Sequence, residues 1–186
     1  MNLLLPGYHI RRGSTVDRAI LVKFMQRTYQ EMFSDQDFSH LALTVEQYFS
    51  TETPLWWVYE DVGAQERQEG KVQDAGGVEE KYQSPITNHQ LPITNHQLPI
   101  ACLWVGNAID QIKGDRHTHI FLLYVVPEHR RRGIGKALMN HVENWAKQRG
   151  DRQIALQVFQ SNTPALQLYH HQGYQTQSLW MVKPLH

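Results

Sequence analysis

Residues 130–136 read Arg-Arg-Arg-Gly-Ile-Gly-Lys, which places four cations and two glycines side by side. From Ile134 onward, apolar residues recur at the spacing of one helix face, and Gly150 is a natural end for that helix. The first amides of a helix have no partner inside it and lie at the positive end of its dipole. Glycines remove the side chains that would keep an anion away from those amides. The sequence therefore predicts a site for a phosphate or a pyrophosphate.

The element that must position this turn is the apolar run 120–126, which directly precedes it. A run of this length, rich in aromatic and β-branched residues, is typical of a strand buried on both faces, and Pro127 ends it. The predicted unit is a strand, a basic glycine turn and a helix. The turn lacks the Gly-Lys-Ser/Thr ending of a P-loop and the third glycine of a dinucleotide-binding turn. The alternative is a basic helix cap without a ligand.

Two patterns in the chain point to a known family. The turn fits Arg/Gln-x-x-Gly-x-Gly with Val-x-Pro-Glu before it, and residues 162–174 fit Asn-x-x-Ala-x-x-Leu-Tyr-x-x-x-Gly-Phe/Tyr. At this separation, and with a strand before the first pattern and a helix after it, they resemble the signatures of the GNAT superfamily of N-acyltransferases. The resemblance covers nearly the whole chain outside residues 61–98. It implies acetyl-CoA as the co-substrate and no metal.

The resemblance also implies which residues bind coenzyme A. Main-chain amides from Arg131 to Lys136 would bind the pyrophosphate. Residues Leu123 to Val125 would hydrogen-bond the pantetheine arm, which would lie beside them like an extra strand. That requires the central strand to part from the next strand. The Val125 amide would lie near the thioester oxygen, and Asn162 would hold the pantetheine or nearby backbone. The expected binding residues are Leu123, Tyr124, Val125, Arg130, Arg131, Arg132, Gly133, Ile134, Gly135, Lys136 and Asn162.

Tyr169 is the candidate general acid that would protonate the leaving thiolate. A thiol has a pKa of about 8.5 and a tyrosine about 10, so the transfer is uphill by about 2 kcal/mol unless the site lowers the tyrosine pKa or shares the proton. The alternative is that Tyr169 only packs.

The general base is not identified by the sequence. Some family members use a carboxylate where this chain has Gln157, which accepts a proton poorly. His117, His119, Asp110 or a chain of waters are the remaining candidates.

The order of predicted elements indicates one α/β domain over residues 1–186, with a mixed sheet flanked by helices. Residues 61–98 are expected to be a flexible insertion, because residues 61–84 are polar and the heptapeptide 85–91 is repeated word for word as 92–98. The expected strands are 8–12, 54–60, 100–105, 120–126, 153–159 and 179–182. The expected helices are 16–33, a short one after Thr44, one from Ile134 to about Gly150, and one capped by Thr163 that ends at Gly173.

Composition excludes several classes of protein. Eighteen basic residues balance eighteen acidic ones, which argues against a nucleic-acid binder built on a global basic field. The single cysteine, Cys102, rules out an internal disulfide framework and fits a reducing compartment. No apolar stretch approaches the roughly 20 residues that a membrane span requires, and no zinc-type spacing is present. We expect a cytoplasmic protein that binds neither nucleic acid nor membrane.

The sequence thus predicts an acetyl-CoA-dependent N-acetyltransferase that moves the acetyl group directly to a primary amine of a small molecule or peptide within a ternary complex. The rival interpretation is a non-catalytic acyl-CoA-binding module that regulates a partner. Gln157 favours the rival slightly, and Tyr169 counts against it. Nothing in the sequence names the acceptor, and a homodimer is left open.

Overall fold

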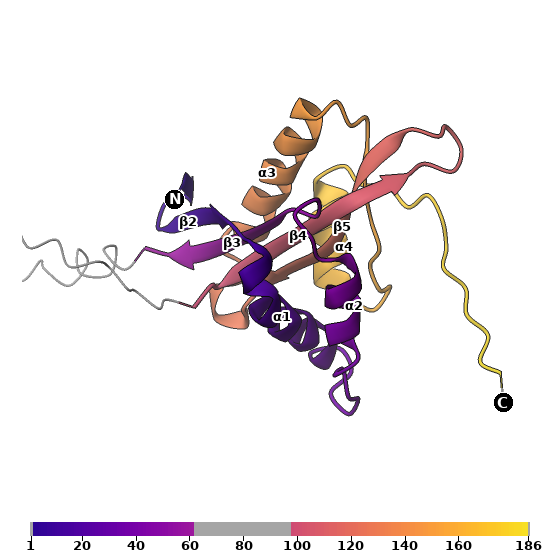
Figure 1. The fold of residues 1–186 in the computed structure, drawn as a ribbon, viewed down its shortest axis with the longest axis horizontal. Helices are drawn as coiled ribbons and strands as arrows, with labels where there is room; N and C mark the ends of the chain where they lie inside the picture. The colour runs from indigo at the N-terminus through magenta and orange to yellow at the C-terminus, as the bar shows by residue number, and fades with distance from the viewer. Residues whose placement is uncertain (1, 62–97, 186) are drawn as a thin grey trace, which may run out of the picture.

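The computed structural model describes residues 2–61 and 98–185. Its centre is a six-stranded sheet in the order β1-β2-β3-β4-β5-β6, with β5 and β6 parallel and every other neighbouring pair antiparallel (Figure 1). The strands are β1 Asn2–Leu5, β2 Tyr8–Arg12, β3 Leu55–Glu60, β4 Ala101–Ile109, β5 Arg116–Val125 and β6 Ile154–Leu156. The predicted insertion at 61–98 and its repeated heptapeptide lie, apart from their end residues, outside the described residues.

Helices cover both faces of this sheet. The helices are α1 Arg18–Gln30, α2 Leu41–Tyr48, α3 Ile134–Gln148 and α4 Thr163–His171, with short 3-10 turns at η1 Thr15–Asp17 and η3 Pro127–His129. The mixed sheet flanked by helices confirms the predicted fold class. Within residues 2–61 and 98–185, no helix has both the length and the apolar character that crossing a membrane would need.

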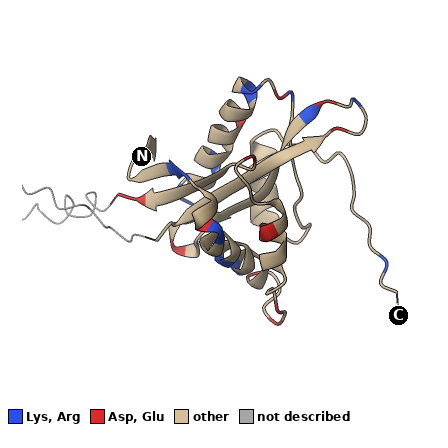
Figure 2. Cartoon of the chain, viewed as in Figure 1, with Lys and Arg blue, Asp and Glu red and all other residues tan. Residues whose placement is uncertain are grey.

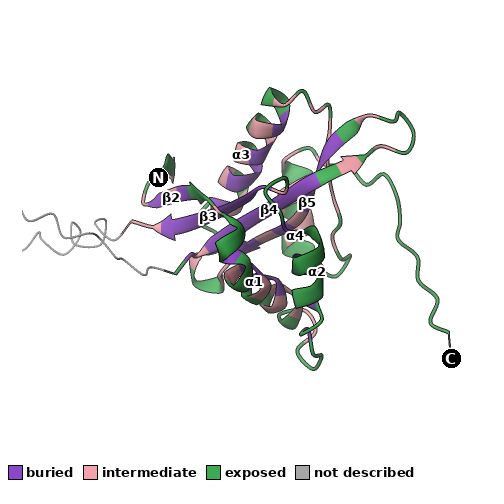
Figure 3. Ribbon diagram, in the orientation of Figure 1, coloured by how far each residue is buried: buried purple, intermediate pink, exposed green. Residues whose placement is uncertain are grey.

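Alternation along the strands divides the core into two clusters. Trp57 and Trp104 face α1 and α2, where Leu21, Phe24 and Val45 are buried. Neighbouring positions on the same strands face α3, and the buried residues there include Val58, Leu103, Leu138 and Val142. Figure 3 shows β3, β4 and β5 as the buried centre of the molecule. Both faces of the central strands are therefore apolar, as their unbroken apolar runs predicted.

A β-bulge interrupts β5 at Phe121. Trp104 pairs with Leu122, but the next residue, Val105, pairs with Ile120, so Phe121 is the extra residue. A Cβ on Gly106 would lie 2.3 Å from the Phe121 ring, so only glycine leaves room for that ring. A bulge bends a strand and increases its twist. The bulge directly precedes the part of β5, residues 122–125, that pairs with β4 but not with β6.

Several predicted boundaries are corrected. The hairpin strand β1 was not predicted, although Pro6-Gly7 before the run of strand 8–12 is a turn signal and Gly7 has a φ of 82°. Helix α1 is preceded by η1 and ends at Gln30 rather than Phe33, and α2 begins at Leu41, before Thr44. Strand β4 extends to Ile109, β5 begins at Arg116, and β6 is limited to Ile154–Leu156.

The predicted last strand at residues 179–182 is wrong. These residues lie in an extended segment that pairs with no strand of the described part of the chain and runs away from the domain in Figure 1. Their apolar and β-branched composition is typical of a strand. Composition cannot show, however, whether a neighbouring strand is available for pairing.

Candidate active site

The basic turn forms a concave set of main-chain donors. Arg131 and Gly133 both have left-handed conformations, with φ of 63° and 83°, and Gly133 is the N-cap of α3. The first bond of the helix runs from the Ala137 amide to the Gly133 carbonyl at 2.9 Å. Within the described ranges, the amides of residues 131–136 donate to no other group. Successive free amides in such conformations make an anion-binding nest.

The two glycines of the turn have different roles. A Cβ on Gly133 would meet nothing within 4 Å, so the space beside this residue is open to a ligand. A Cβ on Gly135 would instead lie 3.2 Å from Cδ2 of Leu168, so Gly135 allows α3 to begin close against α4. Ile134 is 1% exposed and anchors the turn in the core. Of the predicted ligands, Ile134 and Gly135 therefore offer only main-chain groups.

The arginines of the turn are not equivalent. Arg130 donates from Nη2 to Glu31 Oε2 at 2.6 Å and from Nε to the Val125 carbonyl at 2.8 Å. Arg132 donates to the Tyr8 hydroxyl at 3.0 Å and lies 3.7 Å from Glu60. Arg131 and Lys136 are exposed and form no ion pair with any described residue. Arg131 and Lys136 are therefore the two cations of the turn without an acidic partner among the described residues.

Strand β5 has an open edge directly before this turn. It pairs with β6 only at residues 118–120, whereas on its other side it pairs with β4 to its end. The Val126 amide bonds to Ile100, which belongs to the β4 side. Because the main-chain groups of a strand alternate in direction, those of Leu123 and Val125 point to the open edge. The structure thus has the parted strands that pantetheine binding would require.

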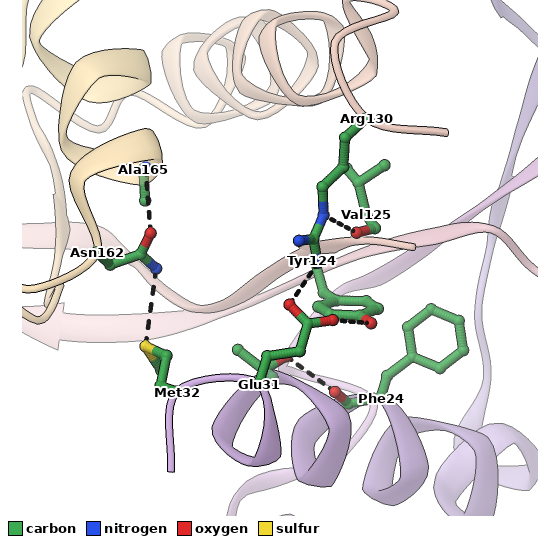
Figure 4. Close-up of polar contacts among 9 residues, drawn as sticks. Phe24, Glu31, Met32, Tyr124, Val125, Arg130, Asn162 and Ala165 are labelled. Carbon is green, nitrogen blue, oxygen red and sulfur yellow. Dashed lines mark hydrogen bonds and ion pairs between the residues drawn. The ribbon is translucent and has the colours of Figure 1, made fainter. Parts of the chain in front are cut away.

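Asn162 lies at the start of α4, which follows β6 in the chain. Its side-chain Oδ1 accepts from the Ala165 amide at 3.2 Å, so Asn162 is the N-cap of α4, and the predicted cap at Thr163 is wrong. Its Nδ2 lies 3.9 Å from the sulfur of Met32, which follows α1 (Figure 4). A chain segment after β6 also meets this region, since Phe159 contacts the rings of Tyr29 and Phe33. Asn162 thus links α4 to the end of α1 across the opening.

Tyr169 lies on α4 in the same apolar cluster as Leu123 and Val125. Its ring centre is 5.9 Å from that of Tyr174. Burial raises the pKa of Tyr169 to about 12 and, with the charge of Glu143, raises the pKa of Tyr174 as well. The sequence considered a lowered tyrosine pKa, and the structure shows the opposite direction. Tyr169 is therefore protonated throughout the neutral range.

The candidates for a general base lie elsewhere. Asp110 accepts from the Ile112 and Lys113 amides and from Gln153, which makes it a turn cap with a lowered pKa. His117 and His119 lie on the first half of β5, and His119 is roughly 20 Å along the strand from Val125 at about 3.3 Å per residue. Burial lowers the pKa of His119. Gln157 is exposed just beyond β6. None of these four residues makes a hydrogen bond or ion pair with Tyr169 in the described part of the chain.

Sequence analysis missed Glu31, the C-cap residue of α1. Its carboxylate accepts from the Tyr124 hydroxyl and from Arg130, both at 2.6 Å, as Figure 4 shows. Burial and Glu31 raise the pKa of Tyr124. Beside this cluster is a cavity of about 420 Å³ that Arg27, Glu31, Tyr124 and Glu128 help to line. Glu31 does not stand out in the sequence, because no local signal marks partners that lie 93 and 99 residues away.

Charged side chains and potential metal ligands also occur outside this site in the described part of the chain. In the view of Figure 2, basic and acidic residues are scattered over the helices and the β4–β5 hairpin rather than gathered by sign. Among residues 2–61 and 98–185, no group of three or more His, Cys, Asp or Glu side chains could hold a metal ion.

Comparison with known proteins agrees with this geometry. Streptothricin acetyltransferase from Streptomyces lavendulae is 40% identical over 50 residues, which are 27% of this chain and 26% of that protein. The [Ribosomal protein bS18]-alanine N-acetyltransferase of Escherichia coli is 36% identical over 67 residues, 36% of this chain and 45% of that protein. The matched part of this chain thus spans less than half of either relative.

Solved structures show the same fold. A predicted acetyltransferase from Clostridium acetobutylicum, solved with acetyl-CoA, superposes with a TM-score of 0.63 at 17% identity, over 95% of this chain and 96% of that one. The sequence model of the acetyltransferase (GNAT) family matches residues 80–174, which include β5, the basic turn, α3 and α4. With that match over half of its length, the chain belongs to the GNAT acetyltransferase family.

Proposed function

We propose that this protein is an acetyl-CoA-dependent N-acetyltransferase that moves the acetyl group directly to a primary amine while both substrates are bound. The observation that carries the proposal is one continuous line of main-chain groups that pair with no other described strand. Within that line, only the Val125 carbonyl has a described partner, Arg130 Nε. It runs from the open edge of β5 at Leu123 and Val125 into the unpartnered amides of residues 131–136. A thioester carrier with a diphosphate fits both parts of that line.

The chain's own groups divide the binding between them. The amides of residues 131–136, with Arg131 and Lys136, hold the diphosphate by charge-assisted hydrogen bonds. The main-chain groups of Leu123 bind the pantetheine arm, and Asn162 holds the far side of the opening. The Val125 amide donates to the thioester oxygen, where negative charge develops during transfer.

Tyr169 stabilises the leaving sulfur by a hydrogen bond. With its pKa near 12, complete transfer of its proton to a thiolate of pKa about 8.5 is uphill by roughly 5 kcal/mol at these values. A shared proton requires no such cost and still favours the departing thiolate. Acetyl-CoA supplies the activated acyl group, and the chain supplies its orientation and the donors.

The acceptor enters from the side of α1 and α2. The support for this placement is the cavity beside Glu31 and the aromatic contacts of Tyr29 and Phe33 with Phe159. Position 157, where some family members have a carboxylate base, holds a glutamine in this chain. We therefore assign the removal of the amine proton to water. The relatives are named for an antibiotic acceptor and for a protein alanine, and both of these acceptor classes are compatible with the proposal.

Two measurements on the full chain test this function. Calorimetry should detect acetyl-CoA binding, and a thiol assay should detect free coenzyme A only when an amine library is added. Binding without amine-dependent thiol release would support the alternative, a non-catalytic acyl-CoA-binding module that regulates a partner. Absence of binding by folded protein would remove both functions.

A further inference from the structure

The C-terminal segment, residues 175–185, has the composition of a buried strand but lies exposed. Leu179, Trp180, Met181 and Val182 are 70%, 81%, 88% and 82% exposed. In the described part of the chain, this segment makes no hydrogen bond, ion pair or ring contact. Four consecutive apolar residues fit a strand that is covered on both faces. So large an apolar run at the surface marks an interaction site.

The last strand of the sheet, β6, has an edge with which this segment could pair. Strand β6 pairs with β5 on one side, and no described strand pairs with its other edge. All three of its residues are only half-buried, and the next helix along the chain, α4, has no buried residue. The hydroxyl of Tyr174 is nevertheless enclosed without a partner. An unpaired edge is a template on which another strand can pair.

The segment does not turn toward this edge. It leaves α4 at Gly173, passes through four polar residues, 175–178, and extends away from its own domain, as Figure 1 shows. Figure 3 shows it exposed along its whole length. Eleven extended residues reach roughly 35 Å, enough to cross to a neighbouring molecule.

We propose that residues 179–182 of one copy pair with the free edge of β6 in a second copy, and that the exchange is reciprocal. A two-fold arrangement satisfies both chains at once, because each one supplies a strand and accepts one. The free edge of β6, the exposed strand and its departure from the domain are independent of whether the proposed transferase activity is correct.

The test is the mass of the full chain in solution, measured by light scattering from about 1 to 100 μM. We expect twice the 21.7 kDa of one chain at the upper concentrations. The double variant Trp180→Ser/Val182→Ser should have the mass of a single chain. The matched control is Ile112→Ser, a side chain 91% exposed in the β4–β5 turn, which should leave the dimer intact.

Hydrogen exchange separates a second copy from the chain's own β6. In the proposed dimer, the amides of residues 179–182 are protected, and protection falls on dilution. A single-chain mass for the unmodified protein would overturn the proposal, as would protection of these amides in a monomer. A dimer that survives the double variant would place the interface elsewhere and overturn it as well.

Discussion

At the scale of single residues, Tyr169 is the clearest link between environment and chemistry. It lies in an apolar cluster with the open edge of β5, and burial raises its pKa to about 12. Such a phenol is a hydrogen-bond donor at every working pH. Its contribution to catalysis should therefore appear in turnover and not in the titration of activity near neutral pH.

Replacing Tyr169 by Phe should lower kcat about 100-fold, because the leaving sulfur loses its donor. The dissociation constant for acetyl-CoA should stay unchanged, since the ring remains and the diphosphate site is elsewhere. Steady-state kinetics and calorimetry on the same preparation check the two parts. Unchanged turnover would remove Tyr169 from the mechanism.

Glu31 shows what one carboxylate does for the site through two of the predicted binding residues, Tyr124 and Arg130. It joins the end of α1 to Tyr124 on β5 and to Arg130 at the start of the basic turn. Tyr124 is 5% exposed, so its hydroxyl would lose its partner in a buried place. The Arg130 guanidinium would also lose the ion pair that holds it against the Val125 carbonyl.

Glu31→Ala should therefore reduce the free energy of unfolding by about 1–3 kcal/mol. For a chain of this size, that lowers Tm by several degrees. Glu46→Ala is the matched control, because Glu46 is exposed on α2 and makes no hydrogen bond or ion pair with a described residue. Thermal unfolding of both variants makes the comparison, and equal Tm values would show that the cluster contributes nothing.

At the scale of elements, the strand–turn–helix unit is the part that sequence predicted best. The helix from Ile134 and the free amides follow from local spacing, because glycine conformation and helix ends are local properties. The contacts of Arg130 and Arg132 could not be predicted in the same way. They reach Glu31 and Tyr8, which are 99 and 124 residues away in sequence. Only the folded sheet brings those partners together.

Strand boundaries were predicted less well where pairing decides them. Residues 153–159 read as one strand, but pairing with β5 ends at Leu156, and Phe159 instead contacts Tyr29 and Phe33. The cap at Asn162 rather than Thr163 differs by one residue, within the usual uncertainty of helix ends. The bulge at Phe121, which precedes the open edge, had no signal beyond Gly106.

The polarity of α3 gives a prediction with its own control. Lys136 is exposed in the first turn of α3, beside the free amides, and Lys147 is exposed in the last turn. Lys136→Glu should weaken acetyl-CoA binding about tenfold or more, since a cation beside the diphosphate becomes an anion. Lys147→Glu makes the same change of charge at the far end of the helix and should leave binding unchanged. Equal losses in calorimetry would mean that net charge, not the turn, governs affinity.

At the scale of the whole molecule, the two sides of the sheet are stabilised differently. The side of α1 and α2 contains fully buried aromatic residues such as Trp57 and Trp104. The side of α4 has no buried residue on that helix and holds two tyrosines whose pKa values are raised by burial. Burial also raises the pKa of Tyr124 and Tyr59 on the side of α1 and α2. Global stability should therefore depend on alkaline pH through tyrosines on both sides, and Tyr169 tests the share of the α4 side.

The direction follows from linkage. Unfolded Tyr169 has a pKa of about 10, and the folded value is about 12. The folded state holds the proton more tightly, so its contribution is complete below about pH 10 and is lost as pH rises toward 12, by at most about 1.4 kcal/mol per pH unit. The raised pKa of Tyr174 acts in the same direction. Urea unfolding at about pH 8, 10 and 11 should show a steeper alkaline loss for the parent chain than for Tyr169→Phe. Equal slopes would mean that the phenol is already solvated in the folded protein and that α4 is not the apolar wall that the site requires.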